Sequence, residues 1–97
     1  MITLKLHYEP PFNILTKKID EKIEIEENIK LMDLIDYLKG IYGNDFKDLV
    51  FDKKKNGEIS SFVSIIINGR SYRHEKFFET LLKDDDDVSF IYIYFGG

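Results

Sequence analysis

The fold is decided by residues 31–41, which read LMDLIDYLKGI. Apolar residues recur there at intervals of three and four, which places them on one stripe of a helix: Leu31, Leu34, Ile35, Leu38 and Ile41. The opposite face carries charged residues, and the Gly43-Asn44 pair that follows suits a left-handed helix end. We therefore predict one amphipathic helix whose apolar stripe packs against a second layer.

The residues before this helix predict two strands. Residues 2–7 alternate apolar and polar side chains, and residues 19–26 show the same period of two. The Pro10-Pro11 pair cannot donate to a strand ladder, so residues 9–13 are expected to form a turn or a loop. A hairpin is the simplest pairing, because a slip of one residue would bury the glutamates of the second strand.

The residues after the helix predict further strands separated by turns. Residues 46–50 are expected to form an irregular or one-turn element, and residues 53–57 an exposed loop. Residues 62–68 predict a strand that ends at Asn68-Gly69, a pair typical of tight hairpin turns because both residues tolerate positive φ. A short returning strand is expected through Ser71-Tyr72.

The last strand is predicted over residues 88–95, directly after the acidic run at residues 84–87. Four consecutive aspartates raise the question of a cation site. A calcium loop, however, spaces its ligands around a bend that contains glycine, so a solvated turn is the favoured interpretation.

The order of these elements is strand, strand, helix, strand, strand, strand. It predicts an α+β two-layer domain in which a mixed sheet packs on one main helix, as in the β-grasp (ubiquitin-like) fold. The first and last strands are expected to be central and parallel, so that the C-terminus leaves from the middle of the sheet. A length of 97 residues fits one domain, residues 1–97, with a C-terminal Gly-Gly tail.

Composition narrows the function classes. The net charge of −4 at pH 7 argues against direct nucleic-acid binding. The absence of cysteine excludes disulfides and thiolate chemistry on this chain's own side chains. No apolar run approaches the roughly 18 residues of a membrane span and no signal segment is visible, so a cytoplasmic protein with no membrane partner is expected.

Familiar catalytic motifs are missing from the sequence, including those for phosphate binding, dinucleotide binding, zinc proteases and serine hydrolases. His7 and His74 are isolated, and we interpret both as surface histidines rather than metal ligands. The chain is therefore not expected to be an enzyme, to bind a metal or to hold a cofactor.

The Gly96-Gly97 end is the one chemically suggestive feature. Glycine has no Cβ, so a diglycine tail can enter a narrow channel and bring its terminal carboxyl close to another enzyme's catalytic atoms. A flexible end or an expression remnant would contain glycine equally well. The residues alone leave both interpretations open.

Three segments together resemble a known family: residues 30–38 on the helix, residues 63–70 at the strand and turn, and residues 82–88 running on to Gly96-Gly97. They are similar to the ubiquitin-like sulfur carriers, in particular the molybdopterin synthase small subunit (MoaD) and the ubiquitin-related modifier, and less so to the shorter thiamine carrier ThiS. Asp85 stands where that family commonly has glycine. Aspartate tolerates the left-handed conformation, so the turn is expected to persist.

The resemblance implies a carrier mechanism in which Gly97 reacts and Gly96 is its required small neighbour. A ubiquitin-activating-type enzyme would adenylate the terminal carboxyl with its own ATP, and a thiocarboxylate would then donate sulfur for molybdopterin biosynthesis or tRNA thiolation. Some members are also joined to lysines as protein modifiers. The implied partners are the adenylating enzyme and either the large subunit of molybdopterin synthase or a tRNA-thiolating enzyme.

A partner-binding surface follows from alternation on the last strands. If Val88 and Phe90 face the helix, isoleucines on the same and the neighbouring strand face outward, and Ser64 and Ser89 face outward with them. The predicted partner-binding residues are Ile66, Ile91, Ile93 and Phe95. Coverage of this face by the Lys53-Lys55 loop or by a second copy is the competing interpretation. The rival function is a β-grasp protein-binding module whose diglycine is incidental.

Overall fold

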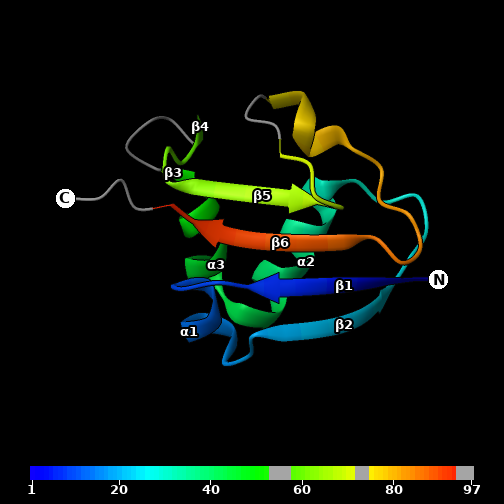
Figure 1. Cartoon of the computed structure of the whole chain (residues 1–97), viewed down its shortest axis with the longest axis horizontal. Coiled ribbons are helices and arrows are strands. Elements are labelled where there is room, and N and C mark those ends of the chain that lie inside the picture. The colour runs from blue at the N-terminus through cyan, green and yellow to red at the C-terminus, as the bar shows by residue number, and fades with distance from the viewer. Residues whose placement is uncertain (53–57, 72–74, 94–97) are drawn as a thin grey trace.

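A four-stranded mixed sheet forms one layer of the molecule, and helices cover one of its faces (Figure 1). The computed structural model describes residues 1–52, 58–71 and 75–93. The strands are β1 (Ile2–Tyr8), β2 (Asp20–Ile25), β5 (Val63–Ile67) and β6 (Asp87–Tyr92), in the spatial order β2-β1-β6-β5. β1 and β6 are parallel in the middle, and each outer strand is antiparallel to its neighbour. The predicted β-grasp arrangement is confirmed.

The predicted amphipathic helix is α2 (Leu31–Tyr42). At its N-terminus, the backbone amide of Lys30 donates a hydrogen bond to the Asp33 carboxylate at 2.9 Å. The helix ends at Gly43, whose φ is +95°. Four of the five predicted stripe residues are fully buried, but Ile41 is 52% exposed. Ile41 falls at the edge of the stripe in the last turn, and Tyr42 takes the inward position there.

Five further elements differ from the sequence-based expectations. Helix α1 (Phe12–Thr16) begins inside the predicted turn, and α3 (Asn44–Val50) is longer than the irregular or one-turn element expected at residues 46–50. Strands β3 (Phe51–Asp52) and β4 (Glu58–Ile59) pair antiparallel, with two residues in each, and a 3₁₀ helix, η2, spans Glu75–Glu79. These elements are too short to show a reliable hydrophobic period, so the sequence predicted part of α3 and none of the others.

The turn at Asn68-Gly69 is confirmed, since Asn68 and Gly69 have φ values of +50° and +84°. The expected returning strand is reduced to a single bridge between Ile67 and Arg70. Ser71 belongs to no strand, and Tyr72 lies outside the described residues. The predicted loop at residues 53–57 also lies outside them.

The acidic run forms the predicted turn before β6 and closes one end of the sheet. Asp84 accepts the backbone amide of Thr3 at 2.8 Å, and Asp85 has the left-handed φ of +67°. The buried Asp86 carboxylate accepts the Asn68 side-chain amide at 2.8 Å and a backbone amide of the turn at 2.7 Å. Because Asp84 and Asp86 are committed to protein donors, the run builds the turn and does not form a cation cage.

An aromatic cluster fills the core at the end of the sheet where β6 finishes. It contains Tyr8, Phe12, Phe46 and Phe90, all essentially without exposed surface, with ring centroids of Phe46 and Phe90 5.3 Å apart in an edge-on arrangement. Such pairs add about 0.5–1.5 kcal/mol each beyond the burial of their apolar area. The cluster joins β1, α1, α3 and β6 into one rigid unit.

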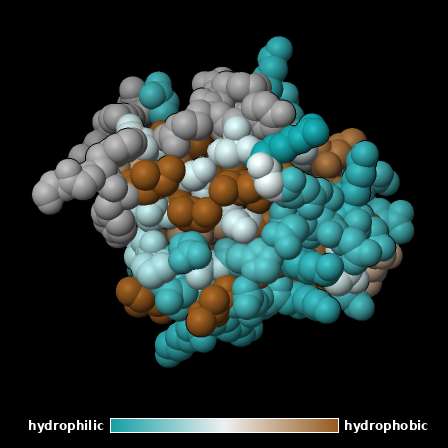
Figure 2. All heavy atoms as spheres, viewed as in Figure 1, coloured by the Kyte–Doolittle hydropathy of each residue, from teal (hydrophilic) through white to brown (hydrophobic). Residues whose placement is uncertain are grey.

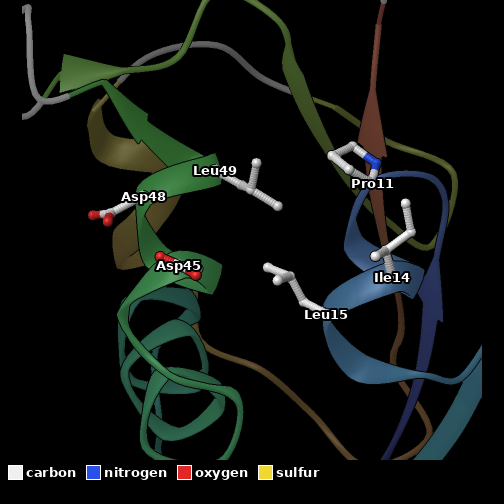
Figure 3. Close-up of a pocket in the computed structure, with 6 residues that line it drawn as sticks. All are labelled: Pro11, Ile14, Leu15, Asp45, Asp48 and Leu49. Carbon is white, nitrogen blue, oxygen red and sulfur yellow. The ribbon is translucent and has the colours of Figure 1, made fainter.

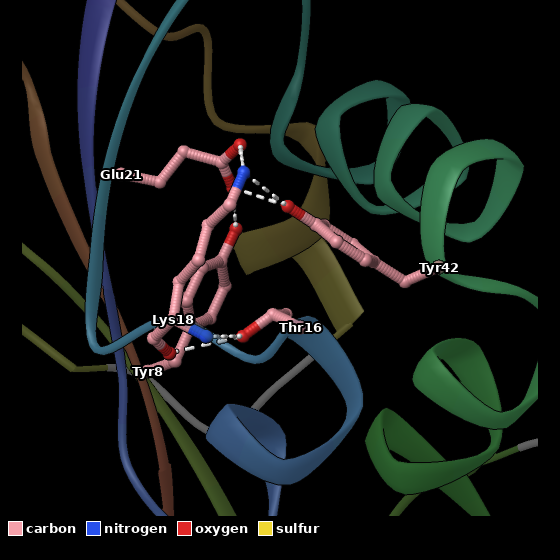
Figure 4. A network of polar contacts seen from close by, with 5 residues as sticks. All are labelled: Tyr8, Thr16, Lys18, Glu21 and Tyr42. Atoms are coloured by element: carbon pink, nitrogen blue, oxygen red, sulfur yellow. Dashed lines mark hydrogen bonds and ion pairs between the residues drawn. The ribbon is translucent and has the colours of Figure 1, made fainter.

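A polar network clamps the edge strand β2 to α2 beside this cluster (Figure 4). The Glu21 carboxylate accepts the hydroxyls of Tyr8 at 2.8 Å and Tyr42 at 2.7 Å. Lys18 pairs with the same carboxylate at 3.0 Å. Burial alone would raise the pKa of Glu21, but the three donors outweigh it and hold the pKa below its ordinary value.

We expect Glu21→Gln to lower the free energy of unfolding at pH 7 by about 1–2 kcal/mol, because a neutral amide accepts these hydrogen bonds less strongly. A lowered folded-state pKa means that the charged carboxylate stabilises the fold above the unfolded pKa. The difference in the free energy of unfolding between the variant and the native protein should therefore shrink as the pH falls through the folded-state pKa of Glu21. Urea unfolding across that range measures it. Glu24→Gln, at an exposed position of the same strand, is the control, and equal effects of the two substitutions would contradict the network's role.

Candidate functional site

The candidate site is the end of β6 and the sheet surface beside it. β6 pairs with β1 on one side and with β5 on the other, and the pairing with β5 extends to Tyr92. The Ile93 amide then donates to the Phe62 carbonyl at 2.5 Å. The chain is thus held by backbone hydrogen bonds as far as residue 93, four residues before its last residue. Phe95, Gly96 and Gly97 lie outside the described residues, and their roles stay predictions.

The strand register places the predicted isoleucines on the outer face of the sheet, away from α2. Ile91 lies opposite Ser64, and Ile66 lies opposite Ser89. Ile66 and Ile91 are therefore diagonal neighbours, and Ile93 lies two positions after Ile91, just beyond the end of β6. We call these three residues, Ile66, Ile91 and Ile93, the isoleucine patch. The prediction that they share one face is consistent with this register.

The isoleucine patch is less open than alternation alone suggested. Ile93 is 38% exposed, whereas Ile66 and Ile91 are half-buried. Ser64, predicted to face solvent, is buried although it lies on the outer face, because its hydroxyl bonds that of Ser71 at 3.1 Å. The segment after the Asn68-Gly69 turn therefore covers part of this face.

The outer face is divided into an apolar and a charged half. Hydrophobic spheres gather over β5 and β6, whereas hydrophilic ones cover β1 and β2 (Figure 2). The charged half carries Lys5 and His7 from β1, which lie opposite Lys22 and Asp20 of β2. A partner that covers the apolar half would meet these charges at its rim.

Phe62 is a residue that the sequence analysis did not single out. It is 45% exposed, and its ring stacks on Tyr92 with centroids 5.9 Å apart. The position of Phe62 follows from the antiparallel register of β5 and β6, because continuing that register places residue 62 opposite residue 93. Phe62 adds apolar surface at the point where the tail begins.

His7 bridges three strands at the border between the two halves. Its Nδ1 lies 2.6 Å from the Asp20 carboxylate, and its Nε2 lies 2.9 Å from that of Asp87. The two carboxylates contact opposite nitrogens of the ring, so they do not converge on a common point where a metal ion could bind. No metal-binding group of His, Asp or Glu occurs in the described parts of the chain. The hydrogen bond to Asp20, followed by that to Asp87, raises the pKa of His7 because both favour the imidazolium.

A raised folded-state pKa stabilises the fold most below the unfolded value of about 6.5, and this stabilisation is lost as the pH rises through the folded pKa. We expect an NMR titration of His7 to give a pKa above 6.5 that falls in Asp20→Asn and, by less, in Asp87→Asn. Glu24→Gln, which changes an exposed carboxylate on the same edge strand, should leave the titration unchanged. An unshifted His7 in the native protein would contradict the bridge.

Among residues 1–52, 58–71 and 75–93, no helix has the length and apolar character needed to span a membrane. The architecture has parallel first and last strands in the centre of the sheet, with a helix packed across it. This arrangement defines a ubiquitin-like β-grasp protein.

The comparisons with known proteins then identify the family. The ThiS family model matches residues 12–97, and the chain belongs to this family of ubiquitin-like sulfur carrier proteins. A candidate sulfur carrier protein of Archaeoglobus fulgidus is 36% identical over 76 residues, which cover 77% of this chain and 83% of that protein. The predicted membership of the ubiquitin-like sulfur carriers is confirmed.

Two solved structures share the fold over nearly their whole length. The small archaeal modifier protein 1 of Methanosarcina acetivorans has a TM-score of 0.74 at 26% identity, covering 100% of this chain and 98% of its own. A candidate molybdopterin converting factor, subunit 1, of Pyrococcus furiosus has a TM-score of 0.73 at 27% identity, covering 97% and 100%. Proteins of this family are small carriers rather than enzymes.

Proposed function

We propose that this protein carries sulfur as a thiocarboxylate on the carboxyl group of Gly97. The observation that carries the proposal is that a family of sulfur carriers matches the chain up to Gly97, on a fold whose central strand β6 leads directly into the Gly96-Gly97 end. The last described residues are fixed by the sheet, so a partner can find the start of the tail at a constant position.

The chemistry needs an activating partner. An α-carboxyl group has an ordinary pKa of about 3.3–3.7, so at neutral pH it is an ionised, poor electrophile. Attack of this carboxylate on the α-phosphorus of ATP forms an acyl-adenylate and releases pyrophosphate. Hydrosulfide then attacks the acyl carbon, AMP leaves, and the thiocarboxylate remains. Glycine at both final positions lets the tail enter the narrow site of the adenylating enzyme, which supplies the ATP.

In this proposal, the residues of this chain bind the partner enzyme and orient the tail, and they perform no chemical step other than the reaction of the Gly97 carboxyl group. The described residues form no metal-binding group, and the domain is too small to add a nucleotide-binding layer. Members of the family work with partner enzymes, and the relative from Pyrococcus furiosus is itself described as one subunit of a converting factor. The thiocarboxylate would pass to a molybdopterin-forming or tRNA-thiolating enzyme that recognises the same tail.

Conjugation to lysine side chains is a second candidate function, and the 26% identity with a small archaeal modifier protein favours it. It uses the same acyl-adenylate, because a lysine amine can attack the acyl carbon where hydrosulfide otherwise does. Both functions therefore depend on the free carboxyl group of Gly97.

The proposal is tested by deleting Gly97. Native chain incubated with ATP, sulfide and the adenylating enzyme of the same organism should gain the mass difference between sulfur and oxygen in an intact-mass spectrum. The chain lacking Gly97 should gain nothing, because its new terminal residue is set back by one position from the reacting atoms. No gain by the native chain with an enzyme that consumes ATP would favour the binding module with an incidental diglycine.

We further propose that the isoleucine patch, with Phe95, contacts the adenylating enzyme. Partly exposed aliphatic residues beside a reactive tail suit the centre of a partner interface. Ile91→Glu should weaken binding by about tenfold or more, since it places a charge in a desolvated contact. Isothermal titration calorimetry against the enzyme measures this change. Ile19→Glu, at an isoleucine that is 70% exposed, is the matched control, and equal affinities of the two variants would argue against the patch.

A further inference from the structure

A second apolar surface lies between α1 and α3, outside the isoleucine patch. It is a groove of about 270 Å³ lined by Pro11, Ile14, Leu15, Asp45, Asp48 and Leu49. Leu15 and Leu49 point into it from opposite walls, and Ile14 stands on the α1 side (Figure 3). Ile14 is 70% exposed, which is unusual for a residue beside a packed wall.

The walls of this groove are rigid. Behind them, Phe12 of α1 and Phe46 of α3 pack with ring centroids 5.3 Å apart, and both rings are fully buried. The groove therefore keeps its shape without an occupant, and a ligand would not have to order it on binding.

Both charged residues that line the groove are acidic. They are Asp45 and Asp48, one turn apart on α3, and the other four lining residues are apolar. Asp48 already has an interaction partner, and Lys47 of the same helix is paired with Asp36 at 2.8 Å, whereas the Asp45 side chain has no hydrogen bond or ion pair among the described residues. An apolar floor with an acidic edge complements an apolar side chain next to a lysine or arginine.

The groove lies at the end of the molecule where β6 finishes (Figure 1). Phe12, at the start of α1, packs against Tyr92, the last residue of β6, with ring centroids 6.3 Å apart. Gly97 is five positions beyond Tyr92, so the reacting carboxyl is at most about 18 Å from Tyr92 along the chain. A protein that encloses the tail comes within reach of the groove.

We propose that the groove between α1 and α3 is a second docking site for the adenylating enzyme, and that it receives a segment of that enzyme in which an aliphatic or aromatic side chain neighbours a lysine or arginine. This inference rests on the proposed carrier function. The apolar side chain lies between Leu15 and Leu49, and the cation pairs with Asp45. The enzyme then contacts the carrier both on the outer face of the sheet and at the helices that cover the inner face.

The absence of cysteine from the chain makes a direct test possible. Ile14→Cys introduces a unique attachment point for a photo-crosslinker at the groove, and Ile19→Cys, equally 70% exposed but outside it, is the matched control. With the full chain and the adenylating enzyme of the same organism, we expect crosslinking from position 14 to exceed that from position 19 several-fold. Mass spectrometry of the crosslinked enzyme peptide should find a basic residue beside an apolar one.

A charge variant provides the second arm. Asp45→Lys should weaken binding to the enzyme about tenfold, and the affinity difference from native protein should narrow as salt is raised. Glu26→Lys makes the same change of charge at an exposed site outside the groove and should stay within about twofold of native affinity. Urea unfolding of each variant verifies that both are as stable as the native chain.

The outcomes separate the two proposals. If the native chain neither binds the enzyme nor gains sulfur, the carrier function fails and the docking site fails with it. If the native chain gains sulfur but positions 14 and 19 crosslink alike, or Asp45→Lys binds like Glu26→Lys, the groove is not a docking site and the carrier function stands. A crosslinked peptide without a basic residue would overturn the stated partner chemistry.

Discussion

The parallel pairing of β1 with β6 is the interaction on which the rest of the structure depends. It joins the first and last described segments of the chain through bonds such as Lys5 amide to Asp86 carbonyl at 2.9 Å and Glu9 amide to Phe90 carbonyl at 3.0 Å. Residues on the inner side of both strands, including Leu4, Leu6 and Phe90, have no exposed surface. The pairing closes a loop of nearly the whole chain, so its entropic cost is met by this burial rather than by local contacts.

This pairing also gives the sheet two faces with different tasks. The inner face is occupied by α2 and the aromatic cluster, so the inward residues of the strands are buried in the hydrophobic core. The outer face is free to differ between strands, and it does: isoleucines on β5 and β6, charges on β1 and β2. β6 is both a core strand and the strand that leads to the tail. A partner that bound the outer face of the sheet would therefore also be positioned next to the start of the tail.

Periodicity in the sequence was sufficient to predict this framework. The stripe of α2, the alternation of β1 and β2, and the Asn68-Gly69 turn each carry a repeated local signal, and each was predicted at nearly its observed bounds. Alternation assigns a residue to a face but does not say what covers that face, which is why Ser64 was wrongly expected to be exposed.

The features that could not be predicted depend on contacts between residues distant in sequence. Helix α1 is five residues long and exists because Phe12 enters the aromatic cluster. The acceptance of the Tyr8 and Tyr42 hydroxyls by Glu21 joins three elements whose relative position no local pattern encodes. The groove between α1 and α3 has the same origin, since it lies between α1, which the sequence did not predict, and α3, of which it predicted only an irregular or one-turn element.

A sulfur carrier has to bind its activating enzyme during the reaction and then dissociate, so that it can reach the protein that consumes its sulfur. One very tight interface with the activating enzyme would therefore be a disadvantage. The two proposed docking surfaces, the isoleucine patch and the groove between α1 and α3, would meet this requirement. Each surface alone offers little apolar area, because the isoleucine patch is half-covered and the groove is about 270 Å³. Once one surface is bound, however, the fold holds the other close to the same partner, so the second contact forms at a high effective concentration. An enzyme that used both surfaces would discriminate this chain from proteins that merely end in diglycine, and because each contact is modest, each could open separately and let the carrier dissociate. The short helices α1 and α3, which the sequence predicted only in part, would then be the elements through which the chain distinguishes its partners.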